Sequence, residues 1–152
     1  MDGSQPSHHL SSSEDWREAQ SEALSSGAHC HEIHVGEWTS FCRWFTANFG
    51  GLELTAETFE GLVRTTEAIN LPLEFIETRV LGDGIRAITI AIRAGSRLHR
   101  LNITDAHHLR MYCNAAGWPT ELEIVSGNKN VFLRFSGGIK SSPQLGTICW
   151  GE

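Results

Sequence analysis

Histidine and cysteine side chains gather at the start of the predicted domain. His29, Cys30, His31 and His34 are close neighbours in the chain, and Cys42 follows them. Zinc in proteins takes four nitrogen or sulfur ligands around a tetrahedron. Neighbouring residues of a strand point to opposite faces, so these side chains cannot all reach one ion, and their spacing matches no standard zinc finger. We therefore favour the start of a strand over a zinc site, and predict no bound metal.

A second group, His107, His108 and Cys113, has the residue types of a thiol nucleophile with its base. Cys113 follows the two histidines by five or six positions, so the three do not share one face of a helix. The apolar pattern also predicts that Cys113 is buried, where a thiol is usually inert. We find no paired acids, no glycine-rich phosphate loop and no G-x-S-x-G. The sequence therefore predicts a protein that is not an enzyme, with no catalytic residue and no cofactor.

Arginines recur through the middle of the chain and suggest contacts with a phosphate backbone. Few aromatic residues lie between them, and no dense basic patch accompanies them. We favour a role in balancing acidic residues and in keeping strand edges soluble, and predict no nucleic-acid partner. The arginines concerned are Arg79, Arg86, Arg93, Arg97, Arg100 and Arg110.

The elements that must position these residues belong to one domain, because 152 residues is the size of an ordinary single domain. Hydrophobic residues make up 40% of the chain, which is typical of a globular protein. The longest run of apolar or small residues, Ala87–Ile92, is far too short to span a membrane, so we predict no membrane partner.

Three segments differ in composition. Residues 1–28 are rich in serine and predict a disordered tail. Residues 29–136 predict a single domain of mixed helix and strand. Residues 137–152 predict a C-terminal tail that acts as a self-association arm, because Leu145, Ile148 and Trp150 are large apolar groups on an otherwise Gly- and Ser-rich segment.

Charge is also unevenly distributed. The net charge is −6, but residues 1–78 carry 3 arginines and 13 acids, hence −10, and residues 79–152 carry 9 basic residues and 5 acids, hence +4. The two parts of the chain are therefore expected to attract each other, or copies of each other.

The first half of the domain predicts a short strand and two helices. Residues 31–35 alternate like a strand. Residues 37–49 place large apolar side chains at helical spacing, and Gly50 and Gly51 end the helix. Thr55 then predicts the N-cap of a second helix that runs to Ile69, with Gly61 in close helix contact.

The second half predicts two hairpins around a third helix. Residues 73–81 and 85–93 form the first hairpin, with Ile76 opposite Ile90. Residues 97–103 are read as either a strand or a loop. Thr104 caps the third helix, which ends at Gly117-Trp118-Pro119.

The last hairpin pairs residues 120–126 with 131–136. This register sets Leu122 opposite Phe135 and Glu123 opposite Arg134. The predicted fold class is α+β: an antiparallel sheet with helices on one face, in the order β-α-α-β-β-α-β-β.

This order of elements resembles the adenovirus early-region-four proteins encoded by the third reading frame of that region. The resemblance covers residues 30–135 and depends on short motifs in a shared order: Cys30-x-x-Ile33-x-Val35, Phe75-Ile76-Glu77, Arg93-Ala94 and Asn114-Ala115. The chain departs from the family in its Ser-rich N-terminal extension, in extra residues after Ala94 and in a longer C-terminal tail.

The resemblance implies a non-enzymatic viral regulator in the host nucleus. Proteins of that family self-assemble into networks that capture and mislocalise antiviral nuclear-body proteins of the tripartite-motif kind and DNA-repair factors. The family's asparagine at the end of the third helix supports higher-order assembly, so Asn114 takes that role by resemblance. Together with Leu145, Ile148 and Trp150 it forms the predicted oligomerisation site.

Two alternatives belong to other classes of protein. The order of elements also resembles type III secretion chaperones, which bind peptides, although this likeness is topological only. An RNA-binding accessory protein would instead use the arginine-bearing strands. Concentration-dependent size would separate the assembling regulator from the chaperone, and a salt-dependent nucleic-acid shift would single out the RNA-binding protein.

Overall fold

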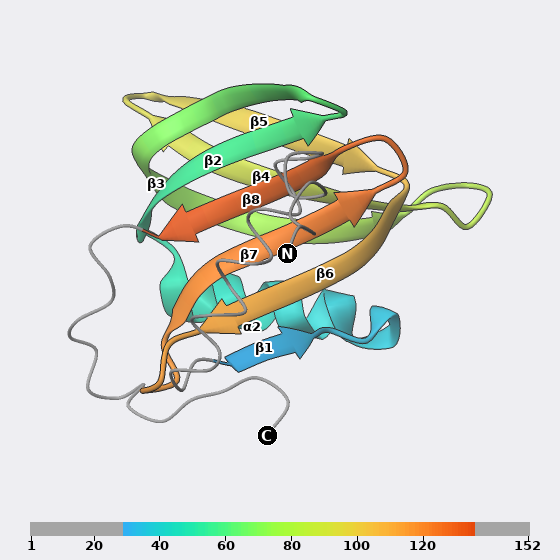
Figure 1. Ribbon diagram of the computed structural model, residues 1–152, viewed down its shortest axis with the longest axis horizontal. Coiled ribbons are helices and arrows are strands. Elements are labelled where there is room, and N and C mark those ends of the chain that lie inside the picture. Colours follow the sequence, from blue (N-terminus) through green and yellow to red (C-terminus); the bar gives the residue numbers. More distant parts are fainter. Residues whose placement is uncertain (1–28, 136–152) are drawn as a thin grey trace, which may run out of the picture.

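A computed structural model describes residues 29–135 of the chain. Eight strands of this part form one antiparallel sheet in the order β1-β6-β7-β8-β2-β3-β4-β5 (Figure 1). The strands are β1 (His29–Glu32), β2 (Glu53–Glu60), β3 (Val63–Val80), β4 (Arg86–Ala94), β5 (Arg97–Thr104), β6 (Ala106–Cys113), β7 (Pro119–Ser126) and β8 (Asn130–Phe135). The α-helix of this part is α2 (Trp38–Phe49), which follows the short 3₁₀ turn η2 (Val35–Glu37). The predicted α+β class with several helices is therefore wrong.

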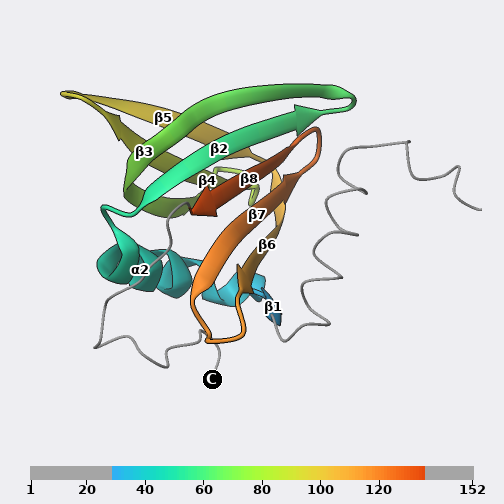
Figure 2. The ribbon, with the colours of Figure 1, turned by 60° about the vertical axis from the view of Figure 1, so that its left-hand side comes forward.

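The sheet is strongly curved. In Figures 1 and 2, β4 and β5 lie behind β2 and β8, and α2 lies across the lower side of the sheet. The hydrophobic core fills the space between the helix and the concave face. Its largest fully buried side chains come from both layers, and include Trp38, Phe41, Phe45, Leu54, Leu73, Ile88, Ile90, Ile92, Ile103, Leu109 and Met111.

The predicted helix over residues 37–49 is confirmed as α2. Phe41, Phe45 and Phe49 recur at helical spacing and all face the core. The rings of Phe45 and Phe49 lie 4.7 Å apart, and Phe45 also contacts Phe135 of β8 at 5.5 Å. The hydroxyl of Thr46 joins the helix to β3, since it accepts from the Ile76 N–H and donates to the Ile76 carbonyl.

The predicted second helix, from Thr55 to Ile69, is wrong. The structure has the β2–β3 hairpin there, with Gly61 at φ +62 in its turn. Threonine, valine, isoleucine and phenylalanine dominate this stretch and favour strands over helices. Gly61 therefore supplies a left-handed turn conformation rather than close helix contact.

The predicted third helix over residues 104–116 is also wrong, because β6 occupies this stretch. Leu109, Met111 and Cys113 alternate toward the core, which is the period of a strand. Asp105, at φ +58, makes the sharp change of direction between β5 and β6. Residues 97–103, left open between strand and loop, are part of β5.

The first predicted hairpin is confirmed, and Ile76 lies opposite Ile90 as expected. In the second hairpin the predicted register is wrong by two residues. Leu122 pairs with Leu133, and Arg134 lies opposite Glu121 rather than Glu123. The turn is shorter than predicted, since Asn130 already belongs to β8. A shift of two residues keeps every side chain on its predicted face.

Candidate functional site

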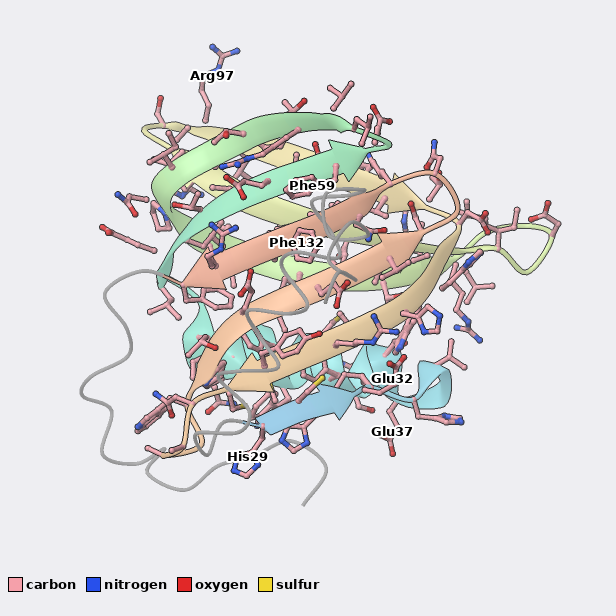
Figure 3. The ribbon with its side chains drawn as sticks, in the orientation of Figure 1. His29, Glu32, Glu37, Phe59, Arg97 and Phe132 are labelled. Atoms are coloured by element: carbon pink, nitrogen blue, oxygen red, sulfur yellow. The ribbon has the colours of Figure 1, made fainter. Side chains whose placement is uncertain are left out.

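The side of the sheet opposite α2 carries a dense row of charged and aromatic side chains (Figure 3). We call this surface the outer face. It extends over β1, β6, β7, β8, β2 and the first part of β3. Its residues are Cys30, Glu32, Glu57, Phe59, Arg64, His108, Arg110, Tyr112, Glu121, Glu123, Phe132 and Arg134.

Arg110 is the centre of the ion pairs over β1, β6 and β7. Its Nε donates to Glu32 Oε1 at 2.7 Å, and its Nη1 donates to Glu123 Oε1 at 3.3 Å. The Tyr112 hydroxyl donates to the same oxygen of Glu123 at 3.0 Å. Burial alone would lower the pKa of Arg110, but the two carboxylates outweigh it and raise that pKa. The guanidinium is therefore a fixed positive charge.

The side chains of His108 and Cys30 lie next to the ion pairs of Arg110, at the β1 edge of the sheet. His108 Nδ1 lies 3.0 Å from Glu32 Oε2. Burial would raise the pKa of Glu32, but the hydrogen bonds from His108 and Arg110 lower it overall. Burial raises the pKa of the Cys30 thiol, which contacts Tyr112, so this thiol is held in its neutral form.

Arg134 is the centre of the ion pairs over β8, β7 and β2. Its Nη2 donates to Glu57 Oε1 at 2.7 Å, and its Nε donates to Glu121 Oε2 at 3.2 Å. Arg64 of β3 donates to the other oxygen of Glu57 at 2.7 Å. Burial would raise the pKa of Glu57, but its two arginine partners outweigh that effect and lower it. Glu57 is thus an ionised carboxylate held between two guanidinium groups.

The lowered pKa of Glu57 predicts a pH-dependent contribution to stability. Its ordinary pKa is 4.5, so the contribution is complete above that pH and is lost as the pH falls through the lower folded value. We expect Glu57→Gln to lose about 1 kcal/mol of unfolding free energy at pH 7, a modest figure because both arginines are partly exposed. Urea unfolding of both proteins from pH 7 down to pH 3 should show this difference shrinking below pH 4.5. A difference that is constant with pH would contradict the ionic role.

Phe132 lies between the two sets of ion pairs, because it is opposite Glu123 of β7 on one side and Glu57 of β2 on the other. Phe59 of β2 and Phe132 of β8 meet edge to face, with ring centroids 5.3 Å apart. The guanidinium of Arg64 lies 6.0 Å from the Phe59 centroid, within range of a cation–π contact. The outer face therefore offers an apolar centre flanked by arginines on both sides.

The centre of the outer face is buried, although it does not belong to the core cluster. Phe132 and the side chain of Glu123 are each 0% exposed, and Glu57, Glu121 and Tyr112 are also buried. None of these residues belongs to the core cluster beneath α2. Figure 3 shows Phe59 and Phe132 on the side of the sheet turned away from α2, and within residues 29–135 no helix or strand covers that side.

A second feature is the edge of the sheet at β3. The first half of β3, Val63 to Pro72, pairs with β2 alone among the described strands. The second half, Leu73 to Val80, pairs with β4, and its other side meets α2 at the hydrogen bonds between Thr46 and the Ile76 backbone. Exposed aliphatic side chains lie on the first, free half and beside it: Val63 is 63% exposed and Ile69 64%, and Leu62, in the turn before the strand, is 79% exposed. The exposed residues between Val63 and Ile69 are polar: Arg64, Thr65 and Thr66. Native proteins usually protect free strand edges with charges, prolines or short strands.

The other two edges of the sheet are protected in this way. β1 has only four residues. β5 presents Arg97, His99 and Arg100. The free half of β3 also carries charges, Arg64 and Glu67, but among the described edges of the sheet it is the one with exposed large aliphatic side chains.

A cavity of about 510 Å³ lies between α2 and β3, lined by Cys42, Arg43, Thr46, Phe75 and Glu77 among others. Burial, and then the nearby Glu77 carboxylate, raise the pKa of the Cys42 thiol to about 12. Such a thiol is neutral near pH 7 and is a poor nucleophile.

The structure places Asn114 in the turn between β6 and β7, not at a helix end. Its Oδ1 accepts from the Ala116 N–H at 2.9 Å and from the Trp118 N–H at 3.0 Å, so its side chain is used within its own turn. Gly117-Trp118-Pro119 is part of this turn and of β7 rather than a helix cap. Leu145, Ile148 and Trp150, the other predicted oligomerisation residues, lie outside the described residues.

The candidate metal and nucleophile groups are not brought together. His29 and His31 have ring centroids 6.2 Å apart, and no three His, Cys, Asp or Glu side chains of residues 29–135 are placed to hold a metal ion. Cys113 faces the core, whereas His108 contacts Glu32 and His107 contacts Asp105. The sequence does not predict the outer face as one surface. Glu121, Glu123 and Arg134 do alternate with apolar residues along their strands, which indicates that they point to the side of the sheet opposite the core.

No helix within the described ranges is long and apolar enough to cross a membrane. Comparisons of the chain with protein-family models, curated proteins and solved structures return no match.

Proposed function

We propose that this chain is a non-enzymatic interaction domain that self-associates by adding a strand at the free half of β3. The observation that carries the proposal is the exposure of two aliphatic side chains, Val63 and Ile69, with Leu62 in the adjoining turn, on an edge that pairs with β2 alone within residues 29–135. Such an edge presents backbone N–H and C=O groups to an incoming strand, and apolar side chains add affinity.

Charge supports contact between copies. The first half of the sequence carries −10 and the second half +4, so copies attract when unlike parts meet. A contact between two different surfaces does not close on itself, and repeated contacts of this kind build open assemblies. The viral regulator that forms nuclear networks is the specific form of this proposal suggested by the sequence resemblance. The resemblance implies assembly through Asn114 at a helix end, whereas the contact proposed here is the free half of β3.

The test is light scattering after size exclusion over a wide range of protein concentration. We expect the full chain to show species that grow with concentration. The variant Val63→Lys/Ile69→Lys should stay small, because two charges on an edge oppose strand addition. Val80→Lys is the matched control: Val80 lies on the same strand and is 60% exposed, but its backbone pairs with β4.

Asn114→Ala separates the two mechanisms of assembly. If the β3 edge is responsible, Asn114→Ala assembles like the natural sequence. Loss of large species in a well-folded Asn114→Ala would instead support the role taken from the family resemblance. A single small species for the natural sequence at every concentration would overturn self-association altogether.

A further inference from the structure

The centre of the outer face is shielded from solvent, although no helix or strand of residues 29–135 lies over it. Phe132 and Glu123 have no solvent exposure, yet they lie on the side of the sheet away from α2 and outside the core cluster. Neighbouring side chains of a single sheet layer leave part of each other open to water. We propose that the chain's own N-terminal segment, residues 1–28, docks on the outer face and covers its centre at Phe59 and Phe132. This proposal is independent of strand addition at β3.

The N-terminal segment is favoured because it joins the described part of the chain beside the outer face. Residue 28 directly precedes β1, which is the outermost strand beside β6 and borders the outer face. Across the outer face, β1 and β2 are separated by four inter-strand spacings, which is a distance of about 19 Å. Residues 14–24 would span about 16 Å as a helix, so a segment of this length reaches from the β1 edge to the aromatic centre.

The sequence of the segment matches the face. As a helix, residues 14–24 place Trp16, Ala19 and Ala23 on one side, at positions i, i+3 and i+7. One large aromatic between small residues suits a face whose apolar centre is the Phe59–Phe132 pair. The Ser-rich segment would thus contain a docking helix within the tail predicted to be disordered.

Charge favours the N-terminal over the C-terminal segment. At the centre of the outer face the acids Glu57, Glu121 and Glu123 are buried, whereas the side chains of Arg64 and Arg134 remain 59% and 43% exposed. The accessible charge over β2, β3 and β8 is therefore positive, whereas the exposed acid of the face, Glu32, lies at the β1 edge. Residues 1–28 carry five acids and one arginine, hence −4, whereas residues 136–152 carry one lysine and one glutamate, hence zero.

Tyr112 provides a specific probe, because it is the only tyrosine of the chain and is buried on the outer face. Tetranitromethane nitrates accessible tyrosines, and mass spectrometry of the full-length protein's peptides reports the rate at Tyr112. We expect slow nitration of the natural sequence. We expect Trp16→Ala to raise the rate by about tenfold, the effect of 1.4 kcal/mol of lost docking free energy.

A pair of matched variants tests the same point without removing a large side chain. Ala19→Asp adds a charge to the docking side of the helix and should also speed nitration. Ser21→Asp adds the same charge to the opposite side and should not. Thermal unfolding of each variant confirms that the sheet is intact, because the proposal requires a change at Tyr112 without loss of the fold.

The remaining outcomes identify other occupants. Faster nitration in Trp150→Ala, with Trp16→Ala unchanged, would assign the face to the C-terminal segment and overturn the proposal. Protection that rises with protein concentration would assign it to a second copy. No change in Trp16→Ala and Ala19→Asp would likewise overturn docking of residues 1–28.

Discussion

Replacing Phe45 with alanine should destabilise the protein by about 3–5 kcal/mol, the cost typical of removing a buried aromatic side chain from a core. Phe45 is fully buried at the centre of the contact between α2 and the sheet. Its ring packs on Phe41 and Phe49 within the helix and on Phe135 of β8. The cavity left behind would separate the helix from the sheet, since these aromatic contacts join the two layers. Urea unfolding monitored by tryptophan fluorescence measures the loss.

Phe75→Ala is the matched control for this substitution. Phe75 is only partly buried on β3, and its ring lies 6.0 Å from the Arg100 guanidinium. The same truncation should therefore cost clearly less than at Phe45. Equal losses at the two positions would show that α2 contributes no more to the fold than the surface of β3.

The correct and incorrect predictions from sequence have a common physical explanation. The helix at residues 38–49 was predictable because four aromatic residues and Cys42 repeat at a helical period and glycines follow them. The hairpin around Ile76 and Ile90 was predictable because a glycine-rich turn joins two alternating segments. In each case the local pattern and the final fold agree.

The two helices were predicted incorrectly in stretches whose apolar residues fit both the helical period of about 3.6 and the strand period of two. In residues 55–69 apolar side chains fall at helical spacing, but most of them are β-branched or aromatic. The structure follows the strand preference of these residue types, with Gly61 as the turn. In residues 104–116 the alternation of Leu109, Met111 and Cys113 carries the correct signal. Thr104, which the sequence favours as a helix cap, is instead the last residue of β5.

The ion pairs of the outer face were not predictable, because they depend on the order of strands. Glu57 and Arg134 are 77 residues apart, and Glu32 and Arg110 are 78 apart. They meet only because β8 pairs with β2 and β1 pairs with β6. The predicted pairing of Glu123 with Arg134 had the correct residue types and the correct face, but chose the wrong neighbour within one hairpin.

The ion pair between Arg110 and Glu123 gives the second large expected effect. The Glu123 carboxylate is fully buried, and Arg110 supplies a cation at 3.3 Å. Arg110→Met keeps most of the apolar stem but removes the charge, so that a buried carboxylate loses its compensating cation. We expect a loss of about 3 kcal/mol at pH 7, at the lower end of the range for breaking a buried pair because Arg110 is partly exposed. Urea unfolding at constant pH measures it.

A double variant distinguishes the buried charge from lost packing. Arg110→Met/Glu123→Leu removes both charges, and it should recover part of the stability that Arg110→Met loses, because the desolvated carboxylate is then absent. Arg93→Met is the matched control, since Arg93 pairs with Glu74 where both side chains are 40% exposed, and its loss should be much smaller. If the double variant is no more stable than Arg110→Met, the uncompensated charge is not the source of the loss. The ion pairs of the outer face would then act through packing, and a docked segment would recognise their shape rather than their charge.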